Sequence, residues 1–587
     1  MRDFPVEDEN DIELPERFKR EGNQAATAAL GWKYLHSVIA RHQDAHPDWS
    51  FVRHEDLSRD PEAGFRGLYN HLGLPFTDAV QASIRSHSDV RNPRQNNEKQ
   101  PHGIRLDSAA NVKSWQRHLN SVTIDFIREI TEDVSSCYYS DDDWADESKQ
   151  VHVKKSSRKK IVILSMSDSG GAGTAAWRLH RGLLNAGTES TMIVGTKKRQ
   201  DPTVRVLPLG AGNGGDLKLL DEDPSNAVWK HAAERWKRNM REYPNRPPGL
   251  ETFTDGRSEV RLDLIREIRE ADIINLHWVA GLLDLPTVGS ILVGKPIVWT
   301  LHDLNAFTGG CHYSAGCLKY RDSCGACPAL GSSSENDLSR QTWTQRSKFY
   351  RELDLHVVTP SNWLANEARS SGLLRGCDVR HISNPHPLDV FKPRDTAALR
   401  RSLKIGDDER VILFGADAVS NLRKGFALLE QALPHLADRL GGEQQIVLLT
   451  MGRKPAPLSA PPGFRVHHLG SLADENRISA VYSMADLFVI PSLEDNLPNT
   501  IAEAMACGTP VVGFAIGGIP EMIEHRKTGY LAKPYDVQDL AQGMNWILDA
   551  IRQDPDLGRR CRLNAEQNYD PKRQTAEYSA VFEELMG

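Results

Sequence analysis

The residues best placed to do chemistry lie in one stretch of the chain, Val489 to Thr509. A polar, turn-rich loop, Glu494 to Asn499, precedes a pattern that predicts a short helix from Thr500 to Cys507. The N-terminus of such a helix presents unpaired backbone N–H groups and a partial positive charge, which suits a phosphate or a sugar hydroxyl. Glu503 lies one turn into this helix, and seven residues separate it from Asp495. The stretch therefore predicts a ligand site.

The apolar runs on either side must position this stretch. Asp486 to Ile490 and Pro510 to Ala515 both have the pattern of buried strands, so the order is strand, loop, helix, strand. This order is one unit of an open α/β sheet, whose active sites lie at the carboxyl ends of strands. His277 and His302 end two other apolar runs and are placed for function in the same way. Further strands are expected at 161–166, 191–195, 271–278, 295–303, 411–415, 446–451 and 464–469.

Residues 504–512 read Ala-Met-Ala-Cys-Gly-Thr-Pro-Val-Val. The stretch resembles the paired-carboxylate signature of retaining glycosyltransferases of the GT-B type, the group 1 kind of bacterial polysaccharide biosynthesis. The family's first glutamate falls on Asp495, with Glu494 just before it, so which carboxylate faces the donor sugar stays open. The resemblance implies that Glu503 binds the ribose of the nucleotide. It also implies that backbone N–H groups of the loop orient the sugar, at Asn496, Leu497, Pro498 and Asn499; the first three replace a family Gly-Phe-Gly.

Other family motifs occur in the same order between about residues 160 and 570. Lys424 matches the family lysine that stabilises the departing diphosphate, and His302 matches a histidine beside the donor sugar. The family's arginine falls on Val419 here, and Arg423 is expected to substitute for it. The loop from Gly170 to Gly173 would lie under the donor's phosphates, which adds Gly171, Ala172 and Gly173 to the donor site. No Asp-x-Asp follows a strand, so we expect metal-independent transfer with no cofactor required for catalysis.

The resemblance implies an α/β fold with two Rossmann-like domains facing across a cleft. The donor would be a UDP- or GDP-linked sugar, and the acceptor a hydroxyl of a glycan or a lipid-linked glycan. We expect a mainly helical segment at 1–145, a charged linker at 146–158, an acceptor-side domain at 159–390, a donor-side domain at 391–570 and a C-terminal helix at 571–587.

Two functions compete with glycosyl transfer for the Rossmann-like part of the chain. Gly171, Gly173 and Ala176 satisfy a dinucleotide-binding fingerprint, and lysines follow the next expected strand, which would suit NADP. An NADP oxidoreductase leaves the signature at 489–512 unexplained. A non-catalytic glycan-binding scaffold is the other competitor, because Asp495 and Pro498 depart from the family pattern.

Composition narrows the class of protein. Charged residues make up 26% of the chain and hydrophobic residues 39%, as in soluble globular proteins. A net charge of −7 gives no reason to expect a nucleic-acid partner. The N-terminus has no apolar core, so no signal peptide is expected, and no apolar run is long enough to span a membrane. A cytoplasmic location is expected.

The first 145 residues have a separate likeness. Phe51 to Phe76 resembles the C-terminal half of sulfotransferases, where a strand ends in Arg-x-Glu-Asp-Leu, and Ser114 to Leu119 and Tyr138 fit the same family's tail. The glycine-rich phosphate loop of that family is missing, since only Gly22 and Gly31 precede Trp49. We expect a helical accessory segment that does not bind the sulfate donor; a bifunctional sulfotransferase–glycosyltransferase is the alternative.

Four of the eight cysteines fall within 17 residues, at Cys311, Cys317, Cys324 and Cys327. The final Cys-x-x-Cys has the spacing of a metal knuckle, and four thiolates would complete a closed structural zinc site. His312 could replace one ligand. Free or redox-active thiols are the alternative, because the spacing of the first pair is irregular.

Asn226 to Arg241 has the pattern of a basic amphipathic helix with two tryptophans. We expect an insertion that packs on its own domain. The alternative is a helix at 226–241 that lies on an anionic membrane, which would place the protein on the inner membrane face near a lipid-linked acceptor.

Overall fold

A computed structural model describes residues 24–46, 49, 51–89, 92, 112, 119, 121–136, 138–139, 144, 159–207, 226–258, 260, 262, 265–285, 292–419, 421–442, 445–453 and 460–586. The expected linker at 146–158, most of Ser114 to Leu119 and the start of the chain lie outside these residues. The chain divides into two compact units, Met1–Ser157 and Arg158–Gly587.

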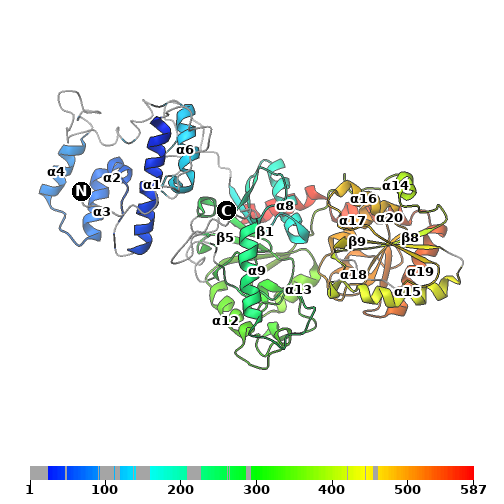
Figure 1. The fold of residues 1–587 in the computed structure, drawn as a ribbon. Helices are drawn as coiled ribbons and strands as arrows, with labels where there is room; N and C mark the ends of the chain where they lie inside the picture. Colours follow the sequence, from blue (N-terminus) through cyan, green and yellow to red (C-terminus); the bar gives the residue numbers. More distant parts are fainter. Residues whose placement is uncertain are drawn as a thin grey trace. The chain divides into compact units, whose positions relative to one another are not determined.

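All the secondary-structure elements described in the first unit are helices, as expected (Figure 1). Its helices are α1 (Gln24–Ala45), α2 (His54–Arg59), α3 (Pro61–His71), α4 (Asp78–Ser88) and α6 (Ser121–Ser135). α1 packs against α6, and Asp60 caps α3 by accepting the N–H of Ala63. Arg53 stands directly before α2, so the Arg-x-Glu-Asp-Leu sequence opens a helix here. The strand that ends in this sequence in sulfotransferases is therefore not seen in the described part of this unit.

The second unit begins with a seven-stranded parallel sheet in the order β3-β2-β1-β4-β5-β6-β7. The strands are β1 (Lys160–Ser167), β2 (Glu189–Thr196), β3 (Val204–Val206), β4 (Ile273–Leu276), β5 (Pro296–Thr300), β6 (Asp354–Thr359) and β7 (Asp378–His381). Six consecutive side chains of β1 are buried, as in a parallel strand covered on both faces. The order reverses at β1 and β4, which is where ligands bind in such sheets. His277 and His302 follow β4 and β5, as the apolar runs predict.

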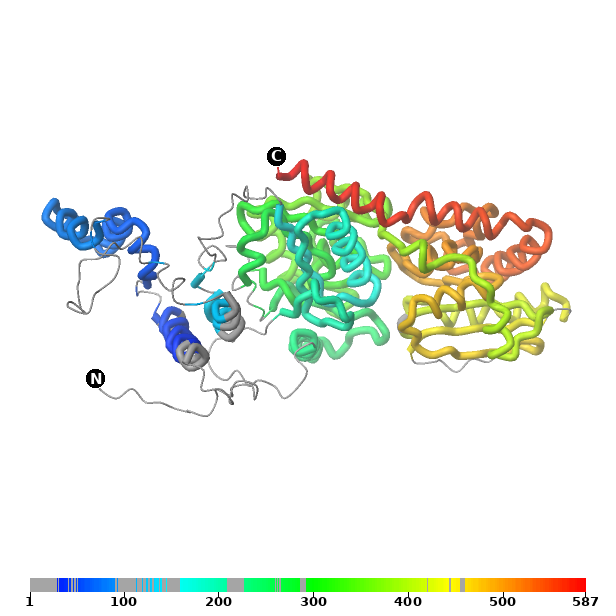
Figure 2. Tube along the Cα trace, turned by 90° about the horizontal axis from the view of Figure 1, so that it is seen from above, coloured from blue at the N-terminus to red at the C-terminus, as the bar shows by residue number. Residues whose placement is uncertain are grey.

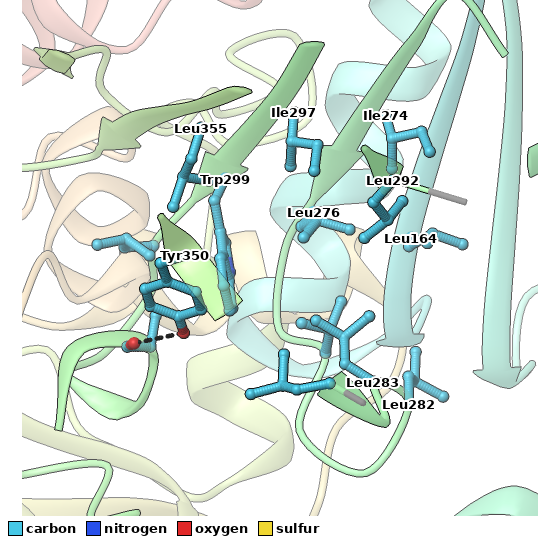
Figure 3. Close-up of a cluster of buried hydrophobic side chains, with 14 of the residues drawn as sticks. Leu164, Ile274, Leu276, Leu282, Leu283, Leu292, Ile297, Trp299, Tyr350 and Leu355 are labelled. Carbon is cyan, nitrogen blue, oxygen red and sulfur yellow. Dashed lines mark hydrogen bonds between the residues drawn. The ribbon is translucent and has the colours of Figure 1, made fainter. Parts of the chain in front are cut away.

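One core cluster packs against this sheet, as Figure 3 shows for Leu164, Leu276, Ile297 and Trp299. The dashed line in Figure 3 marks Tyr350 Oη donating to the backbone carbonyl of Ala306 at 2.7 Å. The helices of this domain are α8 (Gly170–Asn185), α9 (Ala227–Met240), α10 (Arg266–Glu270), α12 (Leu338–Tyr350) and α13 (Asn362–Ser370), with short 3₁₀ turns η5 (Asn305–Phe307), η6 (Lys319–Arg321) and η7 (Pro328–Leu330).

Two expectations about these helices have different outcomes. α8 begins at Gly170, so Gly171 to Gly173 form a helical turn and not the loop that we expected. A Cβ at Gly173 would lie 2.2 Å from the carbonyl oxygen of Ser167, which explains how α8 can start directly at the end of β1. α9 packs on β2 with Val228 and Trp236 buried, as expected for an insertion packed on its own domain. Burial of Trp236 leaves only Trp229 of the two tryptophans exposed.

A second parallel sheet of six strands follows in the order β10-β9-β8-β11-β12-β13. Its strands are β8 (Arg410–Ala418), β9 (Ile446–Arg453), β10 (Phe464–His468), β11 (Leu487–Ile490), β12 (Val511–Phe514) and β13 (Gly529–Ala532). The helical elements of this domain are α14 (Ala397–Ser402), η8 (Leu422–Lys424), α15 (Phe426–Leu440), α16 (Glu475–Met484), α17 (Asn499–Ala506), α18 (Ile519–Met522), α19 (Val537–Gln553) and α20 (Leu557–Asn568). The strand, loop, helix, strand order expected around 489–509 is confirmed.

The last helix, α21 (Pro571–Met586), returns to the first Rossmann-like domain and packs against α8. Tyr578 and Phe582 are buried there in one cluster with residues of β1, and Figure 2 shows this helix in red lying along that domain. Two parallel-sheet domains joined in this way confirm the expected fold class. In the described part of the chain, no helix combines the length and apolar character needed to cross a membrane.

Candidate active site

The loop that follows β11 meets the turn that follows β8, and together they form a charged cluster. Lys424 Nζ lies 2.6 Å from one carboxylate oxygen of Asp495, and Arg423 lies 3.3 Å from the other. Ser492 Oγ also donates to Asp495, at 3.0 Å. Gly425, at φ +70°, lets these turns approach, because a Cβ there would stand 1.7 Å from the carbonyl oxygen of Pro491.

The side chain of Asp495 is buried, so its ionisation depends on this pairing. Burial alone would raise the pKa of Asp495, but Lys424 and Arg423 outweigh burial and hold the pKa below its ordinary value. Burial also lowers the pKa of Lys424, against the opposing effect of Asp495. The cluster therefore holds two cations, Arg423 and Lys424, and one buried anion, Asp495, before any ligand binds.

Arg423 is also held by the first Rossmann-like domain. Its Nε donates to a carboxylate oxygen of Glu251 at 2.8 Å, and its guanidinium lies 3.9 Å from the ring centre of Tyr313. The same arginine donates to the backbone carbonyl of Glu494 at 2.8 Å. Sequence reasoning found Arg423 but missed Glu251 and Tyr313, which lie more than a hundred residues away in the chain.

Glu494 and Asp495, which the sequence leaves undecided, face different partners. Glu494 accepts the backbone N–H groups of Ser314 and Ala315 at 3.2 and 2.9 Å. Burial raises the pKa of Glu494. Asp495, and not Glu494, is therefore the carboxylate that contacts Lys424. Glu494 instead joins its loop to residues 314 and 315, which lie among the four clustered cysteines.

Glu503 lies on α17 and has neighbours from both Rossmann-like domains. Tyr482 Oη lies 3.4 Å from Glu503 Oε2, and a guanidinium nitrogen of Arg178 lies 3.9 Å from Glu503 Oε1. Burial raises the pKa of Glu503 to about 7. Arg178, from α8, is itself buried and donates to Glu475 at 3.3 Å and to the carbonyl of Pro385 at 3.1 Å. Nothing in the sequence singles out Arg178.

The remaining loop residues have distinct places. Leu497 is buried in the core of the second domain, and Pro498 stands directly before α17. Since proline has no N–H, at most three of the four backbone donors expected at 496–499 exist. Asn496 Nδ2 donates to the backbone carbonyl of His302 at 3.2 Å. Asn499 Nδ2 donates to the carbonyl of Gly171 at 3.4 Å, so the structure brings the glycine turn, His302 and this loop together.

The four clustered cysteines line one small cavity of about 20 Å³, together with residues such as Phe253 and Tyr320. All four are free thiols, and the N–H of Gly309 donates to Cys324 Sγ at 3.1 Å. Among the described residues, no three His, Cys, Asp or Glu side chains are grouped closely enough to hold a metal ion. The cysteines therefore converge without forming a ready tetrahedral site. His312, which the sequence offered as a replacement zinc ligand, instead pairs with Asp303 at 2.6 Å.

The second Rossmann-like domain contains a family signature. Residues 409–550 match the family described as glycosyl transferases group 1. At the level of the fold, the chain is similar to sucrose-phosphate synthase from Thermosynechococcus elongatus, with a TM-score of 0.50 and 19% identity over 73% of this chain and 99% of that one. Residues 409–550 are thus similar to the group 1 glycosyltransferase family, and the two Rossmann-like domains share the GT-B fold.

Curated relatives give a closer match over a shorter length. D-inositol 3-phosphate glycosyltransferases of Mycobacterium tuberculosis and Mycobacterium bovis are 32% identical over 201 residues, which is 31% of this chain. The match spans 39% of the length of those relatives. An Anabaena protein solved with UDP and glucose is 17% identical over 73% of this chain and all of its own, with a TM-score of 0.45.

Proposed function

We propose that the protein is a retaining glycosyltransferase that moves a sugar from a UDP- or GDP-linked donor to a hydroxyl of a glycan or lipid-linked glycan. The observation that carries this proposal is the cluster of Arg423, Lys424 and Asp495. It lies at the carboxyl ends of β8 and β11, within the segment that matches the group 1 family. The donor would lie in the cleft between the two Rossmann-like domains.

In the proposed reaction, the bond between the anomeric carbon and the diphosphate oxygen breaks, and the acceptor oxygen forms a bond on the same face. The acceptor's proton passes to the departing diphosphate. Lys424 and Arg423 would stabilise the charge that develops on this leaving group. A diphosphate at Arg423 would take the place of the Glu251 carboxylate, one anion replacing another. No metal and no protein nucleophile are required by this scheme.

Asp495 keeps the two cations in position and, with the backbone N–H groups of Asn496, Leu497 and Asn499, would orient the sugar. Glu503 would accept hydrogen bonds from the ribose hydroxyls. It is suited to this role because its present partners are distant, at 3.4 and 3.9 Å. His302 and the Gly171–Gly173 turn would close the site from the first domain.

A calorimetric panel on the full-length chain tests this function: UDP, GDP, ADP, NADP and adenosine 3′,5′-bisphosphate. We expect saturable binding of UDP or GDP that is lost in Lys424→Met, because the diphosphate depends on that cation. Binding of NADP alone would overturn the proposal in favour of an oxidoreductase. Binding of the adenosine bisphosphate alone would show that the first unit is a sulfotransferase domain, contrary to our expectation that it does not bind this nucleotide.

The cysteine cluster makes a separate prediction. We propose that its four thiols hold a structural zinc ion once their side chains turn toward the shared cavity. Metal analysis of the purified chain should then find about one zinc per protein, and Cys324→Ser with Cys327→Ser should lose it. Cys377→Ser, Cys507→Ser and Cys561→Ser, outside the cluster, are matched controls that should keep the metal. A zinc-free chain in which all four thiols react with a thiol reagent would show free thiols instead.

A further inference from the structure

Two histidines at the ends of neighbouring strands are hydrogen bonded to each other. His277 follows β4, His302 follows β5, and His277 Nδ1 lies 2.9 Å from His302 Nε2. A neutral imidazole carries a proton on only one of its two nitrogens, so either ring could be the donor in this pair. The direction of the bond decides whether the other nitrogen of His302 offers a lone pair or an N–H.

Asn275, on β4, settles the direction. Its Nδ2 lies 2.8 Å from the backbone carbonyl of Val298 and 3.0 Å from Thr300 Oγ1. A backbone carbonyl can only accept, so the amide nitrogen must face it, and the amide oxygen must face the other way. Asn275 Oδ1 lies 3.0 Å from His277 Nε2, which must therefore carry a proton.

The tautomer of His277 then fixes that of His302. With its proton on Nε2, neutral His277 offers only a lone pair at Nδ1, so the N–H in the pair belongs to His302 Nε2. Both rings are neutral near pH 7, because burial lowers the pKa of His277 well below its ordinary value and that of His302 to about 4. The lone pair of His302 is thus left on Nδ1, for which the described residues supply no hydrogen-bond donor.

The free nitrogen belongs to a ring beside the proposed donor site. The ring of His302 is only partly buried, whereas Asn275 and His277 are fully enclosed. The backbone carbonyl of His302 accepts from Asn496, the residue that follows Asp495 in the loop at 494–499, which we propose orients the sugar. His302 therefore presents an acceptor at the place where the second domain meets the first.

We propose that Asn275 and His277 are positioning residues that fix His302 as a neutral hydrogen-bond acceptor, through Nδ1, for a hydroxyl of the bound sugar. The sugar as ligand rests on the proposed function, whereas the tautomer does not. The chain of hydrogen bonds also continues away from the site. Thr300 Oγ1 lies 2.9 Å from Tyr578 Oη, and both residues are buried. Tyr578 belongs to α21, so this helix supports Asn275 through Thr300.

Nitrogen NMR of the full-length chain, labelled with ¹⁵N at histidine, tests the tautomer directly. The chain has 21 histidines, so the His302 signals are assigned by their loss in His302→Gln. We expect His302 to carry its proton on Nε2 at neutral pH. We expect His277→Leu, which removes the acceptor, to turn this signal into a mixture of tautomers. A proton on Nδ1 in the wild-type chain would overturn the proposal, whether or not the variants fold.

Turnover provides the second measurement, with UDP-glucose and GDP-mannose as the donors tried. His277→Leu should lower the turnover number about tenfold while the affinity for UDP or GDP stays within about twofold, because the nucleotide lies elsewhere. Gln has an amide oxygen and an amide nitrogen that can replace the two ring nitrogens, so His277→Gln should restore most of the turnover. Equal loss in both variants, at unchanged melting temperature, would show that the chain of hydrogen bonds has no positioning role. Absence of UDP and GDP binding would refute the proposed function and leave the tautomer result standing.

Discussion

Lys424→Met is expected to lower the turnover number of sugar transfer by about 100- to 1,000-fold, the usual effect of removing one preorganised stabiliser of a developing charge. Lys424 is partly buried and lies 2.6 Å from Asp495, so its charge is in place before the diphosphate departs. Water screens such a charge little, and neighbouring Arg423 already has Glu251 and Asp495 as partners. The two cations therefore cannot substitute fully for each other.

The measurement is turnover with saturating donor, together with the melting temperature of each variant. Arg423 still pairs with Asp495 in Lys424→Met, so we expect the loss of stability to stay below about 3 kcal/mol. Lys527→Met is the matched control: it removes an exposed lysine of the same domain, which pairs with Glu524 at 3.3 Å. We expect this control to keep wild-type turnover. Full turnover in a folded Lys424→Met chain would remove the lysine from the mechanism.

Much of the second domain could be predicted because its signals are local. Apolar runs bounded by turn residues define β11 and β12, and both are completely buried. The pattern between them predicts α17 to within one residue at each end. The resemblance to the family's Lys-Gly before an apolar helix identified Arg423 and Lys424, and the structure places both beside Asp495.

Residues supplied by the first domain could not be found in this way. Arg178 lies within the helix α8, and no motif in the sequence marks it. Only the packing of the two domains brings it to Glu475 and Glu503. Glu251 precedes a short irregular segment with no periodic pattern, yet it pairs with Arg423. Such contacts depend on how two sheets are placed against each other, and residue spacing carries no information about that placement.

The choice between Glu494 and Asp495 shows the same limit at shorter range. Adjacent residues in a loop point in directions that depend on backbone angles, which a sequence pattern does not supply. Gly517, at φ +55°, lies so close that a Cβ would stand 1.9 Å from the carbonyl oxygen of Asp495. The backbone is fixed by this contact, which turns Asp495 toward Lys424 and leaves Glu494 to Ser314.

Glu503 connects the stability of the chain to its proposed function. Burial raises the pKa of this carboxyl from 4.5 to about 7, so the folded chain keeps a proton that the unfolded chain has released over that range. The unfolded state then binds fewer protons than the folded state, and the free energy of unfolding falls as pH rises from about 4.5 to about 7. A shift of this size lowers the free energy of unfolding by about 3 kcal/mol, and the whole decrease is reached above about pH 7.

Glu503→Gln should therefore have two opposite effects. Because glutamine cannot ionise, the variant should be up to about 3 kcal/mol more stable than the wild-type chain at about pH 8 and nearly equal to it at about pH 4.5, as measured by urea unfolding. Its affinity for UDP or GDP should fall about 10- to 100-fold, since an amide offers the ribose a weaker acceptor than a carboxylate does. Glu475→Gln, which changes the other partner of Arg178, is the matched control and should keep most of the pH dependence. If Glu503→Gln gains stability but binds the nucleotide as before, the burial argument stands and the ribose role of Glu503 is wrong.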